Sequence, residues 1–368
     1  MFGLNLLPGF TNPLNIDSEL YKRLLELATA KIKMPNFSIR SAKNIGIMEF
    51  SETYYCNLIN MVGKLFIKEI ISLNDFIFHS LGSMNIADAT YIKREGKKIH
   101  GAKKIKNYVN GVYETLQDVL FIVNRIDGLV FITDFRIINH NKKHLTKPEE
   151  IEGMIKSGEF ENTWFIFDGG LKSKLILEEA RKTATKVITR LNSNFVVTCF
   201  GIKIRKEDIL SNKKPIERTI GGKKYIIYQI KRCVWGKVAG NLFLVKGEGY
   251  DDFIPLFTTS LKSKPETIIS KYNERAQIEQ TNKELKSDLN VEGNYYRKKE
   301  SNHGYIFLVS LVHNIIQHIR LHFRNIKEMS FKDTLNAVSM YLLWKAPPEC
   351  VFEIAEVVKD LSVDTEFS

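Results

Sequence analysis

Cysteine is scarce in this chain, and its spacing argues against two kinds of site. The 368-residue sequence contains four cysteines, and none of them forms a Cys-x-x-Cys pair. Structural zinc sites and disulfide frameworks usually depend on closely spaced cysteines. The scattered thiols therefore argue against both and favour a protein of the reducing cytoplasm.

Long apolar runs are also missing. No stretch reaches the roughly 20 residues that a membrane-spanning helix needs. The opening stretch, MFGLNLLPGFTNP, lacks the basic segment of a secretion signal, and Pro8 interrupts its apolar part. We therefore expect a packed N-terminal arm, no membrane partner and a location in the cytoplasm. Internal repeats and low-complexity segments are absent as well.

The charge is strongly one-sided. Lysine and arginine number 54 against 42 acidic residues, a formal net charge of +12. A surplus of this size favours a polyanionic partner, with nucleic acid first and an anionic membrane surface second. Hydrophobic residues make up 44% of the chain, which excludes a disordered protein.

The order of predicted elements is typical of a mixed α/β protein. After a helical start, the pattern reads strand, strand, strand, helix, strand, helix, strand, with an Asp127-Gly128 turn between the second and third strands. We predict five regions: a helical N-terminal region (1–80), the first part of an α/β core (81–194), a β-rich insertion (195–262), the second part of the core (263–325) and a C-terminal helical tail (326–368).

One charged segment stands out in the second part of the core. Residues 271–289, KYNERAQIEQTNKELKSDL, contain no Gly or Pro and predict a single helix. At about 100° per residue, one face carries an aromatic, cations and a single carboxylate: Tyr272, Arg275, Glu279, Lys283 and Lys286. The apolar residues lie roughly 100° away. A solvated charged face is the ordinary interpretation of such a pattern, so its meaning depends on residues elsewhere.

Two aspartates supply that context. Asp88 lies in the first predicted strand, and Asp168 follows a short, nearly all-apolar strand, NTWFIF. Either residue alone could be a cap or turn aspartate. Together with Glu279, they form three carboxylates that suit Mg²⁺ or Mn²⁺, which prefer oxygen ligands. Two such ions about 4 Å apart can promote phosphodiester cleavage.

At this point the sequence resembles the DDE transposases of prokaryotic insertion sequences. The resemblance covers roughly residues 80–320 and rests on three motifs: Asp88 in IADATYIK, Asp168 in FIFDGG, and the signature Tyr272, Arg275, Glu279, Lys286. This signature is that of the Tyr-Arg-Glu-Lys branch, the insertion-sequence-four type. Members have a ribonuclease-H-like core, often split by a β-rich insertion before the glutamate.

The resemblance implies a function and roles for these residues. Asp88, Asp168 and Glu279 would bind two Mg²⁺ or Mn²⁺ ions. Cleavage at the transposon end would free a 3′-hydroxyl, which then joins to target DNA. The end backbone would be held by four residues of the charged segment: Tyr272, Arg275, Lys283 and Lys286. Arg190, after the fifth core strand, would also contact DNA. Double-stranded DNA is thus the implied partner, with a homodimer acting on paired terminal inverted repeats in the prokaryotic nucleoid.

Several features stay open at the level of sequence. Trp235 in the insertion could stack on a flipped base, as in some relatives, although a core position is the more common fate of tryptophan. The basic run 93–106 could track DNA or form a solvated hairpin. Two other functions also remain: a ribonuclease-H-like nuclease without strand transfer, and a non-catalytic DNA-binding protein derived from a transposase.

Overall fold

The computed structural model describes residues 18–35, 51–77, 80–95, 98–106, 111–139, 145–249, 251–293, 296–322 and 327–344. The expected N-terminal arm and the end of the C-terminal tail lie outside these residues. Within them, no helix is long and apolar enough to cross a membrane.

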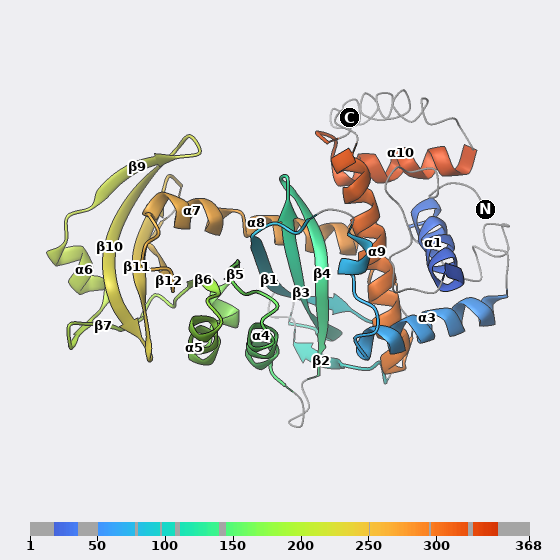
Figure 1. Ribbon diagram of the computed structural model, residues 1–368, viewed down its shortest axis with the longest axis horizontal. Coiled ribbons are helices and arrows are strands. Elements are labelled where there is room, and N and C mark those ends of the chain that lie inside the picture. The colour runs from blue at the N-terminus through green and yellow to red at the C-terminus, as the bar shows by residue number, and fades with distance from the viewer. Residues whose placement is uncertain are drawn as a thin grey trace.

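The core sheet places two short parallel strands beside an antiparallel meander (Figure 1). Its strands are β1 (Met84–Lys93), β2 (Ala102–Lys106), β3 (Tyr113–Ile126), β4 (Leu129–Ile138), β5 (Trp164–Phe167) and β6 (Lys186–Arg190). β3 pairs antiparallel with β1, β2 and β4, whereas β5 pairs in parallel with β1 and β6. The order β4-β3-β1-β5-β6 is consistent with the ribonuclease-H-like fold that the resemblance implies. The predicted mixed α/β class is confirmed.

The sequence explains the tight connection between β3 and β4. Asp127 and Gly128 both have positive φ, at 48° and 87°, and this is the conformation that a two-residue hairpin of type I′ requires. Aspartate tolerates it and glycine adopts it without steric cost. The predicted Asp127-Gly128 turn is therefore confirmed.

Helices cover both faces of this sheet. Consecutive strand residues enter different cores: Ile86 and Ile166 join the cluster under the long helix α9 (Lys299–His322), whereas Ala87 and Phe165 join the cluster under α4 (Lys147–Lys156) and α5 (Lys174–Lys182). This alternation is the period-2 pattern of a strand buried on both sides. Asp88 inside β1 and Asp168 directly after β5 are therefore held by a doubly covered sheet.

Three further helices pack around α9 on the side away from the strands (Figure 1). They are α1 (Ser18–Lys33), α3 (Glu52–Ile67) and α10 (Phe331–Trp344), and the short 3₁₀ helix η2 (Asn74–Phe76) leads into the sheet. Gly63 of α3 and Gly304 of α9 let the two backbones touch, since a Cβ on Gly304 would lie 1.9 Å from the Ile59 carbonyl oxygen. The predicted helical character of the N-terminal region is borne out by α1 and α3.

The segment between β6 and α7 extends the same sheet. We call it the β7–β12 segment, and it contains β7 (Val197–Cys199), β8 (Ile202–Ile204), α6 (Lys206–Asn212), β9 (Ile216–Ile220), β10 (Lys223–Trp235), β11 (Val238–Gly247) and β12 (Ile254–Thr258). β12 returns to pair antiparallel with β6, with Leu256 opposite Arg190. The strand-rich content expected for 195–262 is present, while the five-region division stays a prediction.

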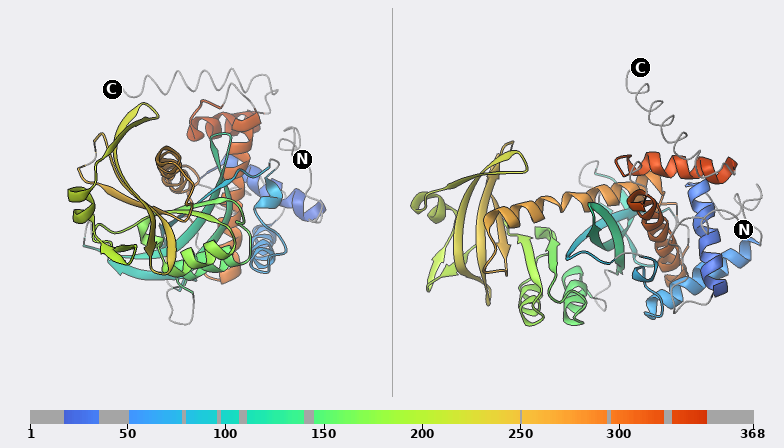
Figure 2. Two further views of the ribbon diagram at one scale, coloured as in Figure 1. Left: turned by 60° about the vertical axis from the view of Figure 1, so that its left-hand side comes forward. Right: turned by 45° about the horizontal axis from the view of Figure 1, so that its top comes forward.

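The single helix predicted for residues 271–289 is wrong in detail. The structure contains α7 (Pro265–Asn273), α8 (Ala276–Lys283) and a π-helical turn, η4 (Glu284–Asp288). Between α7 and α8 the hydrogen bonds shorten to three-residue steps, as in the bond from the Ile278 amide to the Arg275 carbonyl, 3.1 Å long. The pieces still follow one another as a rod that runs from the β7–β12 segment to α9 (Figure 2).

Candidate active site

The two aspartates lie at the same level of neighbouring parallel strands, Asp88 inside β1 and Asp168 directly after the end of β5. Ala87 in β1 is directly opposite Phe167 in β5, so Asp88 and Asp168 each follow a paired residue at the same sheet edge. Both are half-buried. Phe167 is also opposite Thr189 in β6, which places Arg190 at the equivalent point of the next strand.

The Asp-Gly-Gly sequence allows close packing at this edge. Asp168 is followed by the 3₁₀ turn η3 (Gly169–Leu171). A Cβ on Gly169 would lie 2.9 Å from the carbonyl oxygen of Arg190, a distance shorter than side chains tolerate. Glycine therefore lets the turn lie against the end of β6 and keeps Asp168 near Arg190.

Tyr272 of α7 reaches over to the second aspartate. Its hydroxyl donates a hydrogen bond to Oδ1 of Asp168 at 3.3 Å. Burial and the negative charge of Asp168 raise the pKa of Tyr272 to about 12, while Arg275 and Arg190 oppose the rise. The hydroxyl therefore stays protonated and acts as a donor at neutral pH. The structure places Tyr272 beside Asp168, with Arg190 near enough to affect the pKa of Tyr272, while the roles assigned to these residues stay predictions.

Arg275 contacts both Glu279 and Tyr272, the residue that binds Asp168. A guanidinium nitrogen lies 2.6 Å from Oε1 of Glu279, and its central carbon lies 5.9 Å from the centre of the Tyr272 ring. Burial lowers the pKa of Arg275, but Tyr272, Asp168, Glu279 and Asp88 together raise it above its usual value. The cation thus lies in the combined field of all three candidate acids.

Asp88 and Glu279 line one open cleft of about 400 Å³. The cleft also contains two cations and three neutral polar residues: Lys283, Lys286, Thr90, Asn282 and Ser287. Burial lowers the pKa of Lys286, although the negative charges of Glu292 and Asp88 oppose this. Asp168 is not among the residues of this cleft. Of the predicted charged face, Glu279, Lys283 and Lys286 line the cleft with Asp88, whereas Tyr272 contacts Asp168.

One residue of this cleft was missed at the sequence level. Asn282 is 7% exposed and donates a hydrogen bond from Nδ2 to Oδ2 of Asp88 at 3.1 Å. Its position three residues after Glu279 places both on one side of α8. A neutral asparagine in a charged segment does not by itself indicate a functional site, so only its spacing from Glu279 could have pointed to Asn282.

The carboxylate oxygens of the three acids are suitable ligands for divalent cations. The three side chains do not, however, converge on one point. Burial and the charges of Glu279 and Asp168 raise the pKa of Asp88, against the opposing effects of Arg275 and the Ala89 amide. A divalent cation would relieve this repulsion, and all the donors are oxygens. Among the described residues, however, no three acidic, histidine or cysteine side chains form a ready metal cluster. Glu279 is instead paired with Arg275.

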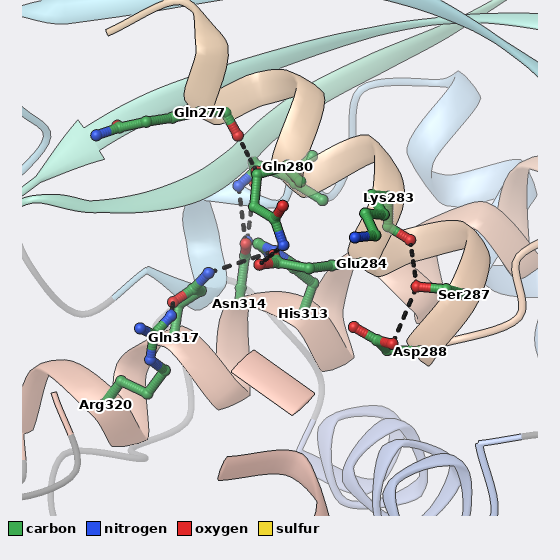
Figure 3. A network of polar contacts seen from close by, with 12 residues as sticks. Gln277, Gln280, Lys283, Glu284, Ser287, Asp288, His313, Asn314, Gln317 and Arg320 are labelled. Atoms are coloured by element: carbon green, nitrogen blue, oxygen red, sulfur yellow. Dashed lines mark hydrogen bonds and ion pairs between the residues drawn. The ribbon is translucent and has the colours of Figure 1, made fainter. Parts of the chain in front are cut away.

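A polar network connects α8 and η4 to α9 (Figure 3). Oε2 of Glu284 lies 3.0 Å from Nε2 of His313 in α9, and Gln280 donates to Oε1 of Glu284 at 3.2 Å. His313 in turn stacks on Phe331 of α10. Because Glu284 lies between Lys283 of α8 and Lys286 of η4, these contacts hold that part of the chain against α9.

The structure also informs two features that the sequence left open. Arg94, in the basic run, is buried and donates to the carbonyl of Val291 at 2.6 Å and to Gln117 at 2.9 Å, so it holds the loop after η4. Lys103 and Lys104 of β2 remain exposed. Trp235 is partly buried against the second core and lies 6.1 Å from the Phe257 ring, which favours the core position.

The sheet order, with helices on both faces, is consistent with the ribonuclease-H-like fold of a transposase. The family model for the transposase DDE domain matches residues 80–315. This match spans more than half of the chain, so the protein belongs to the DDE transposase family. No curated protein matches the sequence.

Proposed function

We propose that this protein is a cut-and-paste DNA transposase of the branch with the Tyr-Arg-Glu-Lys signature. It cleaves DNA at transposon ends and joins the freed 3′-hydroxyl to target DNA. One observation supports this most directly: Asp88 and Asp168 follow matched residues of parallel strands, and Arg275 lies in the field of both while pairing with Glu279.

Two phosphoryl transfers make up the proposed reaction. In the first, a water oxygen bonds to the phosphorus at the transposon end, and the bond from phosphorus to the 3′-oxygen breaks. In the second, that 3′-oxygen bonds to a target phosphorus and displaces a target 3′-oxygen. One proton of the water ends on the freed 3′-oxygen, and in the second step the attacking 3′-hydroxyl loses its proton while the displaced target 3′-oxygen gains one. Atoms and charge therefore balance without any oxidant or nucleotide cofactor.

The side chains of the site divide between holding cations and holding DNA. Asp88, Asp168 and Glu279 would hold two Mg²⁺ or Mn²⁺ ions, which when bound stabilise the charge that develops on phosphate oxygens. Arg275 neutralises Glu279 in the free protein and offers its fork of donors to a phosphate when DNA arrives. Lys283 and Lys286 of the cleft grip the backbone beside it. Arg190 extends this grip along the sheet edge.

Substitution of Glu279 tests the proposal. The substrate is duplex DNA that carries the inverted repeats flanking the coding region, supplied with Mg²⁺ and a target plasmid. We expect Glu279→Gln to lower cleavage and joining by about a thousandfold, because several kcal/mol of charge stabilisation is lost. End binding should persist. Glu266→Gln is the matched control, since Glu266 lies on α7 and pairs with Arg218.

Two other outcomes of this experiment would indicate a different function. Cleavage by the unsubstituted enzyme without any joined product would identify a nuclease. End binding with no Glu279-dependent chemistry would identify a non-catalytic DNA-binding protein.

We further propose that two copies act together on paired ends and that the protein works at the chromosome, in the cytoplasm. The net charge of +12 supports the DNA partner, and the family supports a transposase. Light scattering of the purified complex with end DNA should give two protein chains; a stable complex with one chain would contradict the dimer.

A further inference from the structure

Asn282 lies at the centre of the cleft without an assigned role. It is buried on α8, lines the same cleft as Asp88 and Glu279, and donates from Nδ2 to Oδ2 of Asp88 at 3.1 Å. Its other polar atom, Oδ1, is buried and accepts no hydrogen bond from the residues that the structure describes. An orphaned carbonyl of this kind costs free energy, so its presence calls for a reason.

The orientation of the amide has a physical cause. If the amide were turned over, its oxygen would face the Asp88 carboxylate, and two acceptors would repel each other. The observed orientation satisfies Asp88 and leaves the Asn282 oxygen unpaired. The side chain is therefore arranged for the benefit of the aspartate.

We propose that Asn282 is a positioning residue for Asp88. Its amide engages Oδ2 of the carboxylate, fixes the rotation of the Asp88 side chain and leaves Oδ1 to face a divalent cation. The inference rests on the proposed function, because it assigns Asp88 to cation binding. Donors behind a metal-binding carboxylate commonly change metal affinity by about 10–100-fold.

Binding of Mn²⁺ to the full-length protein without DNA tests this role. We expect Asn282→Ala to weaken Mn²⁺ binding by about 10–100-fold in calorimetry or electron paramagnetic resonance. Asn282→Ser, which keeps a short donor, should recover part of the loss. The matched control is Ser287→Ala, since Ser287 lines the same cleft but donates to the carbonyl of Lys283 at 2.8 Å.

A second readout separates positioning from direct participation. If Asn282 acts through Asp88, end cleavage by Asn282→Ala should return toward the normal rate as Mn²⁺ approaches saturation. Cleavage that stays low at saturation, or Mn²⁺ binding equal to that of the unsubstituted protein, would overturn the inference. Thermal unfolding without metal checks that the variant folds, and if Asn282→Ala does not, Asn282→Ser carries the comparison.

Asp88→Ala separates this inference from the proposed function. If that variant binds Mn²⁺ and cleaves end DNA normally, the proposed function fails. If Asp88→Ala is defective while Asn282→Ala behaves like the unsubstituted protein, only the role of Asn282 is lost.

Discussion

At the scale of the residue, each of the three acids of the candidate site has a specific polar or charged partner. Asp88, Asp168 and Glu279 could be selected from the sequence because their types and spacing match a known chemistry. Asn282 could not, because its role depends on which carboxylate the fold places in front of it. The same holds for Arg94, whose sequence neighbours Lys93 and Glu95 are exposed but whose side chain is buried.

A residue outside the site gives a prediction about pH. Asp134 in β4 is 7% exposed, and burial raises its pKa to about 7, although Arg136 at 3.0 Å opposes the rise. The native protein therefore holds a proton that the unfolded chain releases between about pH 4 and 7. The contribution of Asp134 to stability is present below pH 4 and is lost as the pH rises through 7.

Replacing the Asp134 carboxyl with an amide should remove the loss of stability that occurs as the pH rises. We expect Asp134→Asn to raise the free energy of unfolding by about 4 kcal/mol at pH 8 relative to its effect at pH 4, as the shift is about three pKa units and each unit corresponds to about 1.4 kcal/mol. Urea unfolding at the two pH values measures this. Asp251→Asn, at an exposed position, serves as the control, and parallel pH curves for Asp134→Asn and the unsubstituted protein would contradict the assignment.

At the scale of the element, local pattern predicted most strands and helices but not the breaks between them. The β3–β4 hairpin follows from its turn residues, and the structure confirms it. The division of residues 271–289 has no local signal, because the segment lacks Gly and Pro. It depends instead on contacts such as Glu284 with His313 in α9, which is 29 residues away. π-helical turns of this kind are frequent at functional sites.

The crossing of α3 and α9 gives a prediction at this scale. Added Cβ atoms on Gly63 and Gly304 would lie 1.8 and 1.9 Å from backbone oxygens of the opposite helix. We expect Gly304→Ala to destabilise the fold by about 3 kcal/mol, because backbone cannot yield as a side chain does. Gly153→Ala in α4 is the matched control, since nothing lies within 4 Å of its added Cβ. Its higher helix propensity should leave stability equal or slightly raised. Equal melting temperatures for the two variants would contradict the close crossing.

At the scale of the whole molecule, the charge surplus becomes a testable property of DNA binding. Lysine and arginine that neutralise phosphates release counterions, so binding should weaken steeply as salt rises. We expect Lys283→Gln and Lys286→Gln each to reduce the slope of log affinity against log salt by about one. Fluorescence anisotropy with end DNA measures the slope. Lys64→Gln on α3 is the control, and an unchanged slope for both cleft variants would place the DNA elsewhere.

The class of the whole fold could be predicted because strand and helix alternation survives in the sequence. The pairing that joins the β7–β12 segment to the core sheet could not be predicted. Nothing in residues 195–262 indicates that they would join the core sheet through β12 rather than form a separate body, since strand pairing over such distances leaves no local pattern.

The pairing of β6 with β12 has a consequence for how this chain can change. Because Arg190 and Leu256 are cross-strand partners, the chain leaves and re-enters the core as the two arms of one hairpin. A short reverse turn could close that hairpin and omit residues 191–255 while β5, β6 and α7 keep their places. The junction is therefore a point where the inserted segment can be shortened, lengthened or replaced while the sheet edge that carries the candidate site stays the same.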